Sequence, residues 1–265
     1  MTIEERIAVI GGAGWLGGAL IRAAVSAGAV DPTRLTVSAR SDRKGAIADI
    51  PAYFTRDNQA AASRADIVIL SVPPPQFREL QLNLGGRLVV SVMAGVSCQA
   101  IASATQAAGV VRALPNAAAS IGQSFTPWFA TEAVSQAQKA SVQTFFQASG
   151  DAVETADEAF IDYFTGMTGS GAAFPALLAE ALAAHAVSKG IPASLAQQAA
   201  RKVVAGASQL FAGPHGDAGA IVKEMIDYRG VVAAALQAML DSGFNQAVAA
   251  GLQAAANKAA SIASS

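Results

Sequence analysis

The chain has 265 residues, of which 52% are hydrophobic and 14% charged, which excludes a disordered protein and leaves room for two domains with cores of their own. The formal net charge of -1 excludes the basic surface with which proteins bind nucleic acid or anionic membranes. The single cysteine, Cys98, excludes an internal disulfide and a cysteine-rich metal site, as expected in a reducing compartment.

The beginning of the chain, MTIEER, is acidic and leads directly into an apolar segment, so no signal peptide is predicted. The longest uncharged stretch, residues 88–111, is interrupted by Ser91, Gly95, Ser97 and two glutamines, unlike a membrane helix. We therefore expect a soluble, cytoplasmic protein.

Short β-branched runs alternate with helix-sized segments in the first half of the chain. Continuous apolar strands separated by helices are typical of a parallel sheet covered on both faces. The sequence therefore predicts a doubly wound α/β domain over residues 1–156, with strands at residues 6–10, 35–39, 66–72, 87–92 and 110–114.

A glycine-rich segment, GGAGWLG, follows the first of these strands and contains Gly12, Gly14 and Gly17 in the spacing GxGxxG. In that context Gly12 permits a tight turn, Gly14 lets the backbone approach a pyrophosphate, and Gly17 lets the next helix pack closely. The spacing predicts a Rossmann-type dinucleotide-binding domain, with a plain strand-to-helix turn as the alternative.

The helix after this turn is expected to begin near Leu16 and to offer unpaired amides to the pyrophosphate. Trp15, inside the glycine segment, is interpreted as cover for the cofactor crevice. Gly11 is one glycine more than the motif requires, and we expect it only to relax the turn.

The second predicted strand ends in Ser38, Ala39, Arg40 and Ser41, with no acidic residue at the strand end. An acid there binds the ribose hydroxyl of NAD, whereas cations and hydroxyls suit the phosphate of NADP. Ser38, Arg40 and Ser41 therefore predict NADP(H) as cofactor, with NAD as an alternative and a solvated basic turn as the alternative role of these residues.

Strand signals stop after residue 156, and alanine-rich helical runs follow at residues 171–189, 194–211, 231–240 and 244–260. Alanine lets helices approach closely but buries little area per residue. We therefore expect an all-α dimerisation domain over residues 157–265 that a second subunit completes.

The motifs of both halves together resemble the pyrroline-5-carboxylate reductase family, which reduces a cyclic imine with NAD(P)H in the last step of proline synthesis. The matching segments run in the family's order and cover nearly the whole chain: GAGWLGGALIRA, VSARS, TRDNQAAASRADIVILSVPPPQ, SVMAGVS, VRALPNAAASIGQSFTPWFA and FTGMTGSGAAFPALLAEALAAHAVSKGIP. The resemblance implies a homodimer through the C-terminal helices, sometimes assembled further, with the active site between the two domains.

The resemblance also implies roles for individual residues. Those that would contact the cofactor are Asn58 near the adenosine ribose, Val72 and Pro73 in the loop over the cofactor, and Met93, Ala94 and Gly95 beneath the nicotinamide. Those that would contact the substrate are Asn116 of the Pro115–Asn116 pair, Ser170 and Gly171 of the segment that starts at Thr168, and Gly230.

Two segments depart from the family's pattern. Pro73 stands where the family has a lysine, and IDYRGVV, residues 226–232, stands where the family has TSPGGTT, which contacts the substrate carboxylate and ring nitrogen. Only Gly230 is retained, and the side chains of Val231 and Val232 donate no hydrogen bonds. The predicted substrate is therefore a small cyclic imine or amino-acid-like compound, not specifically pyrroline-5-carboxylate.

The replaced segment offers polar side chains of its own. We hypothesise that Arg229 pairs with a substrate carboxylate and that Tyr228 donates a proton or hydrogen bond to the reacting nitrogen or oxygen. The alternative is a helix start with Asp227 as its N-cap and Arg229 on the surface.

No metal site is predicted, because the two histidines, His185 and His215, are isolated and lie near no cysteine cluster. His185 is interpreted as packed or as part of the dimer contact, with a catalytic role as the alternative, and His215 as a solvated turn residue with substrate contact as the alternative. Ser170 lacks the strand context of a nucleophile elbow, so we expect its hydroxyl to cap the helix or touch a ligand.

Two other functions stay open at this point. One is a dinucleotide-binding paralogue without turnover, in a regulatory role. The other is a dehydrogenase for a hydroxy acid or a prephenate-like substrate, which the GGAG form of the glycine segment also permits.

Overall fold

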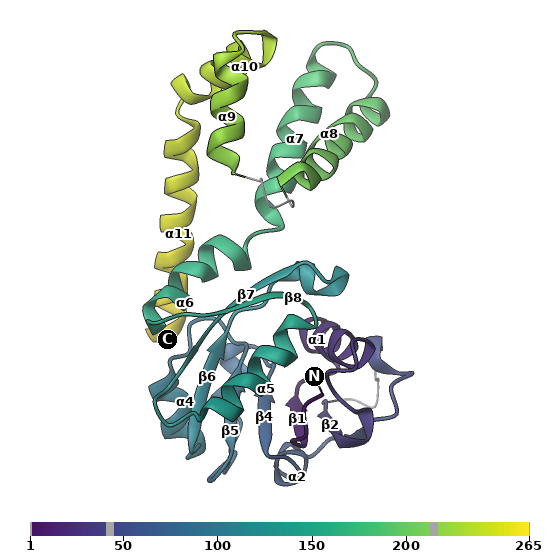
Figure 1. Ribbon diagram of the computed structural model, residues 1–265, viewed down its shortest axis with the longest axis vertical. Coiled ribbons are helices and arrows are strands. Elements are labelled where there is room, and N and C mark those ends of the chain that lie inside the picture. Colours follow the sequence, from purple (N-terminus) through teal and green to yellow (C-terminus); the bar gives the residue numbers. More distant parts are fainter. Residues whose placement is uncertain (1, 41–44, 212–216, 265) are drawn as a thin grey trace. The chain divides into compact units, whose positions relative to one another are not determined.

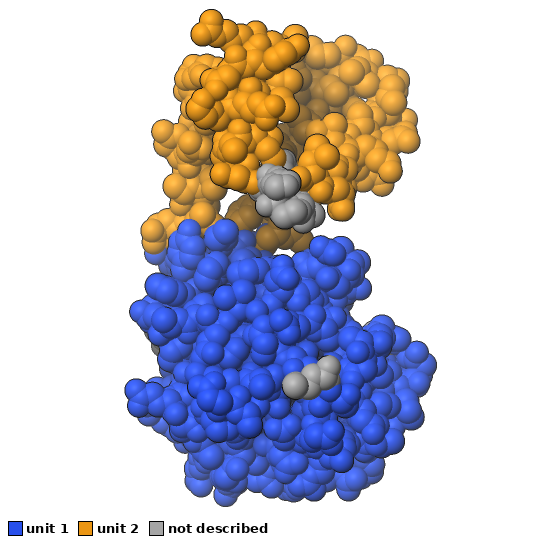
Figure 2. Space-filling view, viewed as in Figure 1, with its two compact units in different colours: residues 1–170, 254–265 blue, residues 171–253 orange. Residues whose placement is uncertain are grey.

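The computed structural model describes residues 2–40, 45–211 and 217–264. The chain divides into two compact units, coloured separately in Figure 2: residues 1–170 with 254–265, and residues 171–253. The first unit extends beyond the predicted boundary at residue 156 because helix α6 (Glu158–Phe164) is joined to the sheet by ion pairs of Glu158 and Asp162 with Arg112.

The first unit is built around an eight-stranded sheet with the order β3-β2-β1-β4-β5-β6-β7-β8 (Figure 1). Neighbouring strands are parallel, except for the antiparallel pair β6 and β7. The strands are β1 Ile7–Ile10, β2 Leu35–Ser38, β3 Tyr53–Thr55, β4 Ile67–Leu70, β5 Leu88–Ser91, β6 Gly109–Ala113, β7 Ser124–Ala130 and β8 Gly150–Glu154. The predicted doubly wound sheet is confirmed, and the five predicted strands are present.

Three strands escape the sequence analysis for physical reasons. β3 is a three-residue, partly exposed strand at the edge of the sheet. β7 contains Pro127, which has no N–H for a ladder and so argues against a strand. β8 mixes acidic and apolar residues and exposes most of them, so it lacks the continuous apolar run of a buried parallel strand.

Helices cover both faces of the sheet (Figure 1). On one face, α1 (Trp15–Ser26) and α5 (Gln136–Gln147) share a core with Ile7 and Val9 of β1. On the other face, α2 (Asn58–Ser63) and α4 (Cys98–Thr105) share a core with Ala8 and Ile10 of the same strand. The remaining short segments are η1 Pro32–Arg34, η2 Gly45–Ile47, α3 Pro74–Phe77, η3 Ala117–Ile121 and the π-helical turn η4 Thr165–Gly169.

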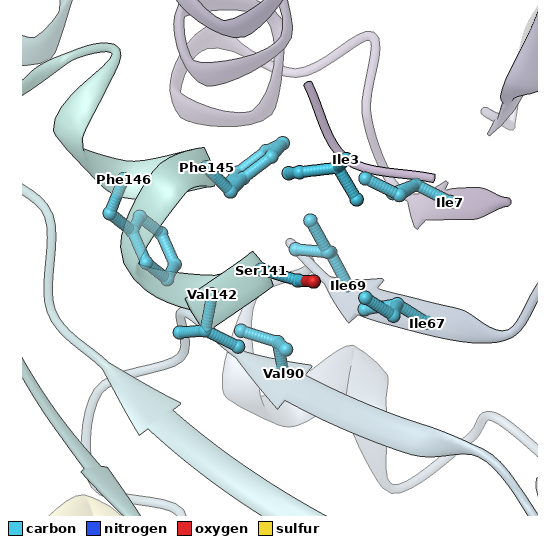
Figure 3. Close-up of a pocket in the computed structure, with 9 residues that line it drawn as sticks. All are labelled: Ile3, Ile7, Ile67, Ile69, Val90, Ser141, Val142, Phe145 and Phe146. Atoms are coloured by element: carbon cyan, nitrogen blue, oxygen red, sulfur yellow. The ribbon is translucent and has the colours of Figure 1, made fainter. Parts of the chain in front are cut away.

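The packing of α5 onto the sheet is nearly complete. A cavity of about 10 Å³ remains there, and Figure 3 shows the side chains of β1, β4, β5 and α5 that point toward one another around it. Its one polar side chain, Ser141, already donates to the Glu5 carboxylate, so the cavity offers no polar anchor for a water molecule.

The second unit is helical, which confirms the predicted all-α C-terminal part. Its elements are α7 Ala173–Ser188, α8 Ala193–Ala207, η5 Ser208–Phe211, α9 Ala218–Asp227, α10 Val231–Asp241 and the first part of α11 Phe244–Ser264. Helix α9 is not among the predicted helical runs. The last part of α11, from residue 254, belongs to the first unit, where Ala259 is buried.

The helical unit has almost no core of its own. Among its described residues only Ala196 and Ala200 are buried, whereas Leu177, Leu195 and Val203 are all more than half exposed. An apolar surface of this extent is rarely left open to water, because burying it is the main stabilising force of a fold.

The stretch Glu158–Ser188 is, within the described residues, the one helical stretch that is long and apolar enough to span a membrane, by length and composition alone. Its first two turns carry Glu158 and Asp162, and both carboxylates pair with the buried Arg112 of β6. The beginning of the stretch, up to residue 170, is therefore part of the sheet unit. The rest of the stretch, from residue 171, is part of the helical unit.

Candidate functional site

The turn between β1 and α1 requires glycine at several positions. Gly11 has φ +79°, and a Cβ atom there would lie 2.4 Å from the Ser71 carbonyl oxygen. A Cβ atom at Gly12 would lie 2.8 Å from Val37 Cγ1, and one at Gly17 would lie 3.0 Å from the Gly12 Cα. The expectation that Gly11 only relaxes the turn is wrong, because both its backbone angle and its contact with Ser71 exclude a side chain.

The N-terminus of α1 is left open toward solvent. Gly14 is its N-cap and makes no side-chain cap hydrogen bond, and Trp15, the first helical residue, is 66% exposed. The first amides of a helix have no intrahelical acceptor, so this end carries partial positive charge. With Leu16 half-buried and no acidic residue in the first turn, the end is suited to an anion.

A cleft of about 600 Å³ lies at the carboxyl ends of β1, β2 and β4. In this sheet β2 lies on one side of β1 and β4 on the other, so the cleft occupies the point where the strand order reverses, the usual ligand position in such folds. The predicted cofactor residues that line it are Gly14, Arg40, Asn58, Val72 and Pro73. It is also lined by Gly11, Ser71, Gln76 and Glu79, none of which the motif analysis selected.

Ser38, at the end of β2, acts on the cleft indirectly. The side chain is fully buried, and its hydroxyl donates to Asn58 Oδ1 at 2.7 Å. The bond directs the Asn58 amide group rather than leaving the hydroxyl for a ligand. Arg40 is exposed at the rim, and Ser41 lies outside the described residues.

The loop after β5 holds the segment assigned to the nicotinamide side. Val92 N donates to Leu70 O of β4 at 3.1 Å, and Met93 N donates to the buried Ser91 Oγ at 3.2 Å. Ala94 is half-buried, and Gly95 has φ +70°, a backbone angle that favours glycine. The loop is thus fixed beside the end of β4, next to the cleft wall.

The π-helical turn η4 lies against Leu114, two residues before Asn116. Asn116 N donates to Ser124 Oγ at 3.1 Å, and its side chain accepts from Ala118 N, which caps η3. In η4, Thr168 Oγ1 donates to Phe164 O, and a Cβ atom at Gly169 would lie 3.8 Å from Leu114 Cδ2. Turns of the π type occur frequently at functional sites.

Ser170 and Gly171 follow η4, both half-buried. The N-cap of α7 is Ala172, with no side-chain cap hydrogen bond. The expected capping role of Ser170 is therefore wrong, and ligand contact remains as the prediction for its hydroxyl.

The segment at residues 228–230 belongs to the helical unit and joins α9 to α10. Tyr228 is 85% exposed, Arg229 has φ +57°, and Gly230 is the N-cap of α10 without a side-chain cap bond. Asp227 is the last residue of α9, so its alternative interpretation as an N-cap is wrong. The first backbone amides of α10 are therefore free to bind an anion. The side chains of these residues do not reveal this possibility.

In the described residues, no group of three or more His, Cys, Asp or Glu side chains is arranged to hold a metal ion. His185 is exposed on α7 in the single chain, so the dimer contact stays as its prediction, and His215 lies outside the described residues. Burial raises the pKa of the Cys98 thiol to about 12, with a further contribution from the Glu158 charge, so it stays neutral near pH 7.

Comparisons with known proteins agree with this geometry. The family described as "Pyrroline-5-carboxylate reductase dimerisation" matches residues 158–262, and the family described as "NADP oxidoreductase coenzyme F420-dependent" matches residues 6–95. The pyrroline-5-carboxylate reductase of Synechocystis is 32% identical over 203 residues, covering 75% of this chain and 76% of that protein.

Two solved structures have the same fold along almost the whole chain. The pyrroline-5-carboxylate reductase of Coxiella burnetii superposes with a TM-score of 0.87 at 26% identity, covering 97% of this chain and 98% of that one. The pyrroline carboxylate reductase of Plasmodium falciparum, solved with NADP bound, gives a TM-score of 0.84 at 18% identity, covering 99% and 100%. The resemblance found in the sequence is confirmed, and the chain belongs to the pyrroline-5-carboxylate reductase family.

Proposed function

We propose that the protein is an NADPH-dependent reductase that transfers hydride to the C=N bond of a small cyclic imine carrying a carboxylate. The observation that carries the proposal is the open N-terminus of α1, which faces the cleft where the strand order of the sheet reverses. In a member of this family, that arrangement is a dinucleotide site.

The residues of the cleft fit the cofactor. A Cβ atom at Gly11, Gly12 or Gly17 would meet neighbouring protein atoms, so glycine lets the turn fold tightly at these positions. The tight turn presents the first amides of α1 to a diphosphate. Arg40 at the rim suits the 2′-phosphate, and Asn58, directed by Ser38, suits the adenosine ribose. When bound, NADPH supplies the hydride.

The substrate carboxylate has a second anion site available, in the helical unit. The amides at the start of α10 are uncapped, and Arg229 precedes them directly. Arginine in the left-handed region costs about 1 kcal/mol relative to glycine, and strain of this kind often marks a functional position. We therefore assign Arg229 and the α10 amides to the carboxylate, and Tyr228 to the proton that the imine nitrogen gains.

The helical domain, from residue 157 onward, is proposed to pair with a second copy of the chain. Support comes from the exposed apolar side chains of α7 and α8 and from the match to a dimerisation domain over residues 158–262. We propose that the homodimer works in the cytoplasm, because the one cysteine, Cys98, is free and buried, as expected in a reducing compartment.

The test is NADPH oxidation with a panel of cyclic imines, pyrroline-5-carboxylate among them, each compared with an analogue that lacks the carboxylate. We expect turnover of a carboxylate-bearing imine and a KM at least tenfold higher without that group, since hydrogen bonds to charged groups contribute about 1.5–3 kcal/mol. NADPH binding without any turnover would favour the non-catalytic paralogue. NADP reduction by a hydroxy acid would favour the dehydrogenase.

Two variants address the proposed roles in the helical unit. Arg229→Ala should raise the KM for the imine about tenfold or more with kcat nearly unchanged, and Tyr228→Phe should lower kcat. Lys202→Ala removes another exposed cation of the same unit and is the matched control. Wild-type kinetics in both variants would remove both assignments and leave the α10 amides as the carboxylate site.

A further inference from the structure

A buried arginine connects the sheet to the beginning of helix α6. Arg112 lies on β6 with 2% of its side chain exposed, and Nη1 pairs with Glu158 Oε1 and Nη2 with Asp162 Oδ1, each at 2.7 Å. Burial lowers the pKa of Arg112, but the hydrogen bonds to Asp162 and Glu158 raise it by more, so the guanidinium stays charged. A buried charge is tolerated only when it is paired in this way.

Glu158 has a second partner that Asp162 lacks. The same Oε1 atom accepts a hydrogen bond from Cys98 N at 2.8 Å, at the first residue of α4. The carboxylate thus caps the N-terminus of α4, together with the Ser97 side chain, while it holds Arg112. One side chain therefore fixes α4 to β6 through α6.

Each of the three elements carries a segment of the proposed nicotinamide and substrate side. The loop of residues 93–97 leads directly into α4, and the strand β6 leads through Leu114 to Asn116. Helix α6 continues without a break into the π-helical turn η4, where Gly169 lies against Leu114. The contacts of Glu158 therefore set the spacing of three segments that are far apart in the chain.

We propose that Glu158 is a positioning residue for hydride transfer: by holding Cys98 N and Arg112 together, it fixes the loop of residues 93–97 against the turn at Asn116. The inference rests on the proposed function. Glu158 contacts neither cofactor nor substrate and acts through the loop, so its loss should misplace the reacting carbon rather than weaken binding of the diphosphate and adenosine at α1 and Arg40.

Asp162 provides a matched control in the same cluster. Its side chain is 52% exposed and pairs with the same arginine, but no contact to α4 is found for it in the described part of the chain. Asp162→Ala therefore weakens the ion pair while leaving the cap of α4 in place. Glu158→Gln keeps an oxygen that accepts from Cys98 N but removes the charge.

Hydrogen–deuterium exchange of the nucleotide-free protein tests the geometry without any turnover. In Glu158→Ala the amides of residues 93–98 should exchange at least tenfold faster than in the wild type, because the Cys98 amide loses its acceptor. Asp162→Ala and Glu158→Gln should stay within about twofold of the wild type. Equal acceleration in Glu158→Ala and Asp162→Ala would overturn the proposal, since it would reflect only the loss of an ion pair.

Kinetics with the imine tests the consequence for the reaction. Glu158→Ala should lower kcat at least tenfold and change the Kd of NADPH by less than twofold, and the kinetic isotope effect with 4-deuterated NADPH should rise as hydride transfer becomes limiting. Asp162→Ala should keep kcat within twofold, and Glu158→Gln should recover most of the activity. Loss of kcat in proportion to the unfolded fraction would refute the positioning role. A wild-type protein that exchanges as expected but turns over no imine would instead refute the proposed function, and the role of Glu158 in positioning for hydride transfer with it.

Discussion

At the scale of single residues, the glycine turn shows how a short contact decides which residue type is allowed. The spacing of Gly12, Gly14 and Gly17 is visible in the sequence, and it correctly predicts a turn beside the cleft. The requirement for glycine at position 11 is not visible, because it comes from the carbonyl of Ser71, the residue after β4, and from a backbone angle. The local spacing predicts the turn, whereas a contact with a residue distant in the chain makes glycine obligatory at position 11.

Substitution of Gly11 should therefore destabilise the fold far more than expected for a residue outside the GxGxxG motif. Gly11→Ala should lower the free energy of unfolding by about 2–4 kcal/mol and weaken NADPH binding, because the backbone must move away from Ser71. Gly28→Ala is the control, since Gly28 has a similar φ of +67° but no atom within 4 Å of a Cβ. Urea unfolding of both variants measures the difference, and equal losses would mean that the backbone angle alone matters.

Cys98 should make the protein less stable at alkaline pH. Its pKa of about 12 in the folded chain lies above the ordinary value of 9.0, so the folded state keeps a proton that the unfolded state loses. The free energy of unfolding should fall as the pH rises above about 9, by up to about 1.4 kcal/mol per pH unit from this group. Cys98→Ala should flatten that slope in urea unfolding between pH 9 and 11, and an unchanged slope would mean that other groups cause it.

At the scale of elements, sequence patterns predict the strands that are continuously apolar. They miss strands and ion pairs that form only through contacts with neighbouring elements. The five buried parallel strands and the glycine turn follow from pattern, whereas β7 with Pro127 needs β6 and β8 beside it to become a strand. The link between Arg112 and Glu158 is equally hidden, because 46 residues separate the two in the chain. The open start of α10 is equally hidden in the sequence, because Val231 and Val232 offer backbone amides there and their side chains give no sign of it.

The contact of α5 with the sheet should be a major source of stability that leaves the cleft untouched. Phe146 of α5 is fully buried, and the cavity beside it is only about 10 Å³, so Phe146→Ala should lower the free energy of unfolding by about 3–5 kcal/mol (Figure 3). Gln147→Ala, at the exposed neighbouring position, should cost less than about 0.5 kcal/mol. The folded fraction of Phe146→Ala should bind NADPH with wild-type affinity in calorimetry, and a weaker affinity would link α5 to the cleft.

At the scale of the whole molecule, the two units differ in how much hydrophobic core they bury by themselves. The sheet unit buries large cores on both of its faces, whereas the helical unit buries only two alanines among its described residues. The sequence predicts this difference through the alanine-rich helices, but it does not say which helical faces stay uncovered.

A charge placed on the uncovered helices should separate the subunits. Leu177 on α7 is 64% exposed, and Leu177→Glu should convert a dimer of the wild-type protein into monomers at micromolar concentration in sedimentation experiments. Gln99→Glu adds the same carboxylate to the exposed surface of α4 and should remain dimeric. A wild-type protein that sediments as a monomer would contradict the proposed pairing.

The return of α11 to the first unit has a consequence for biosynthesis. Ala259 is buried in a unit whose other residues, up to Ser170, leave the ribosome much earlier. A nascent chain that ends at residue 253 should therefore form the sheet without the part of α11 that packs on it, and the first unit should complete its packing only when residues 254–264 follow.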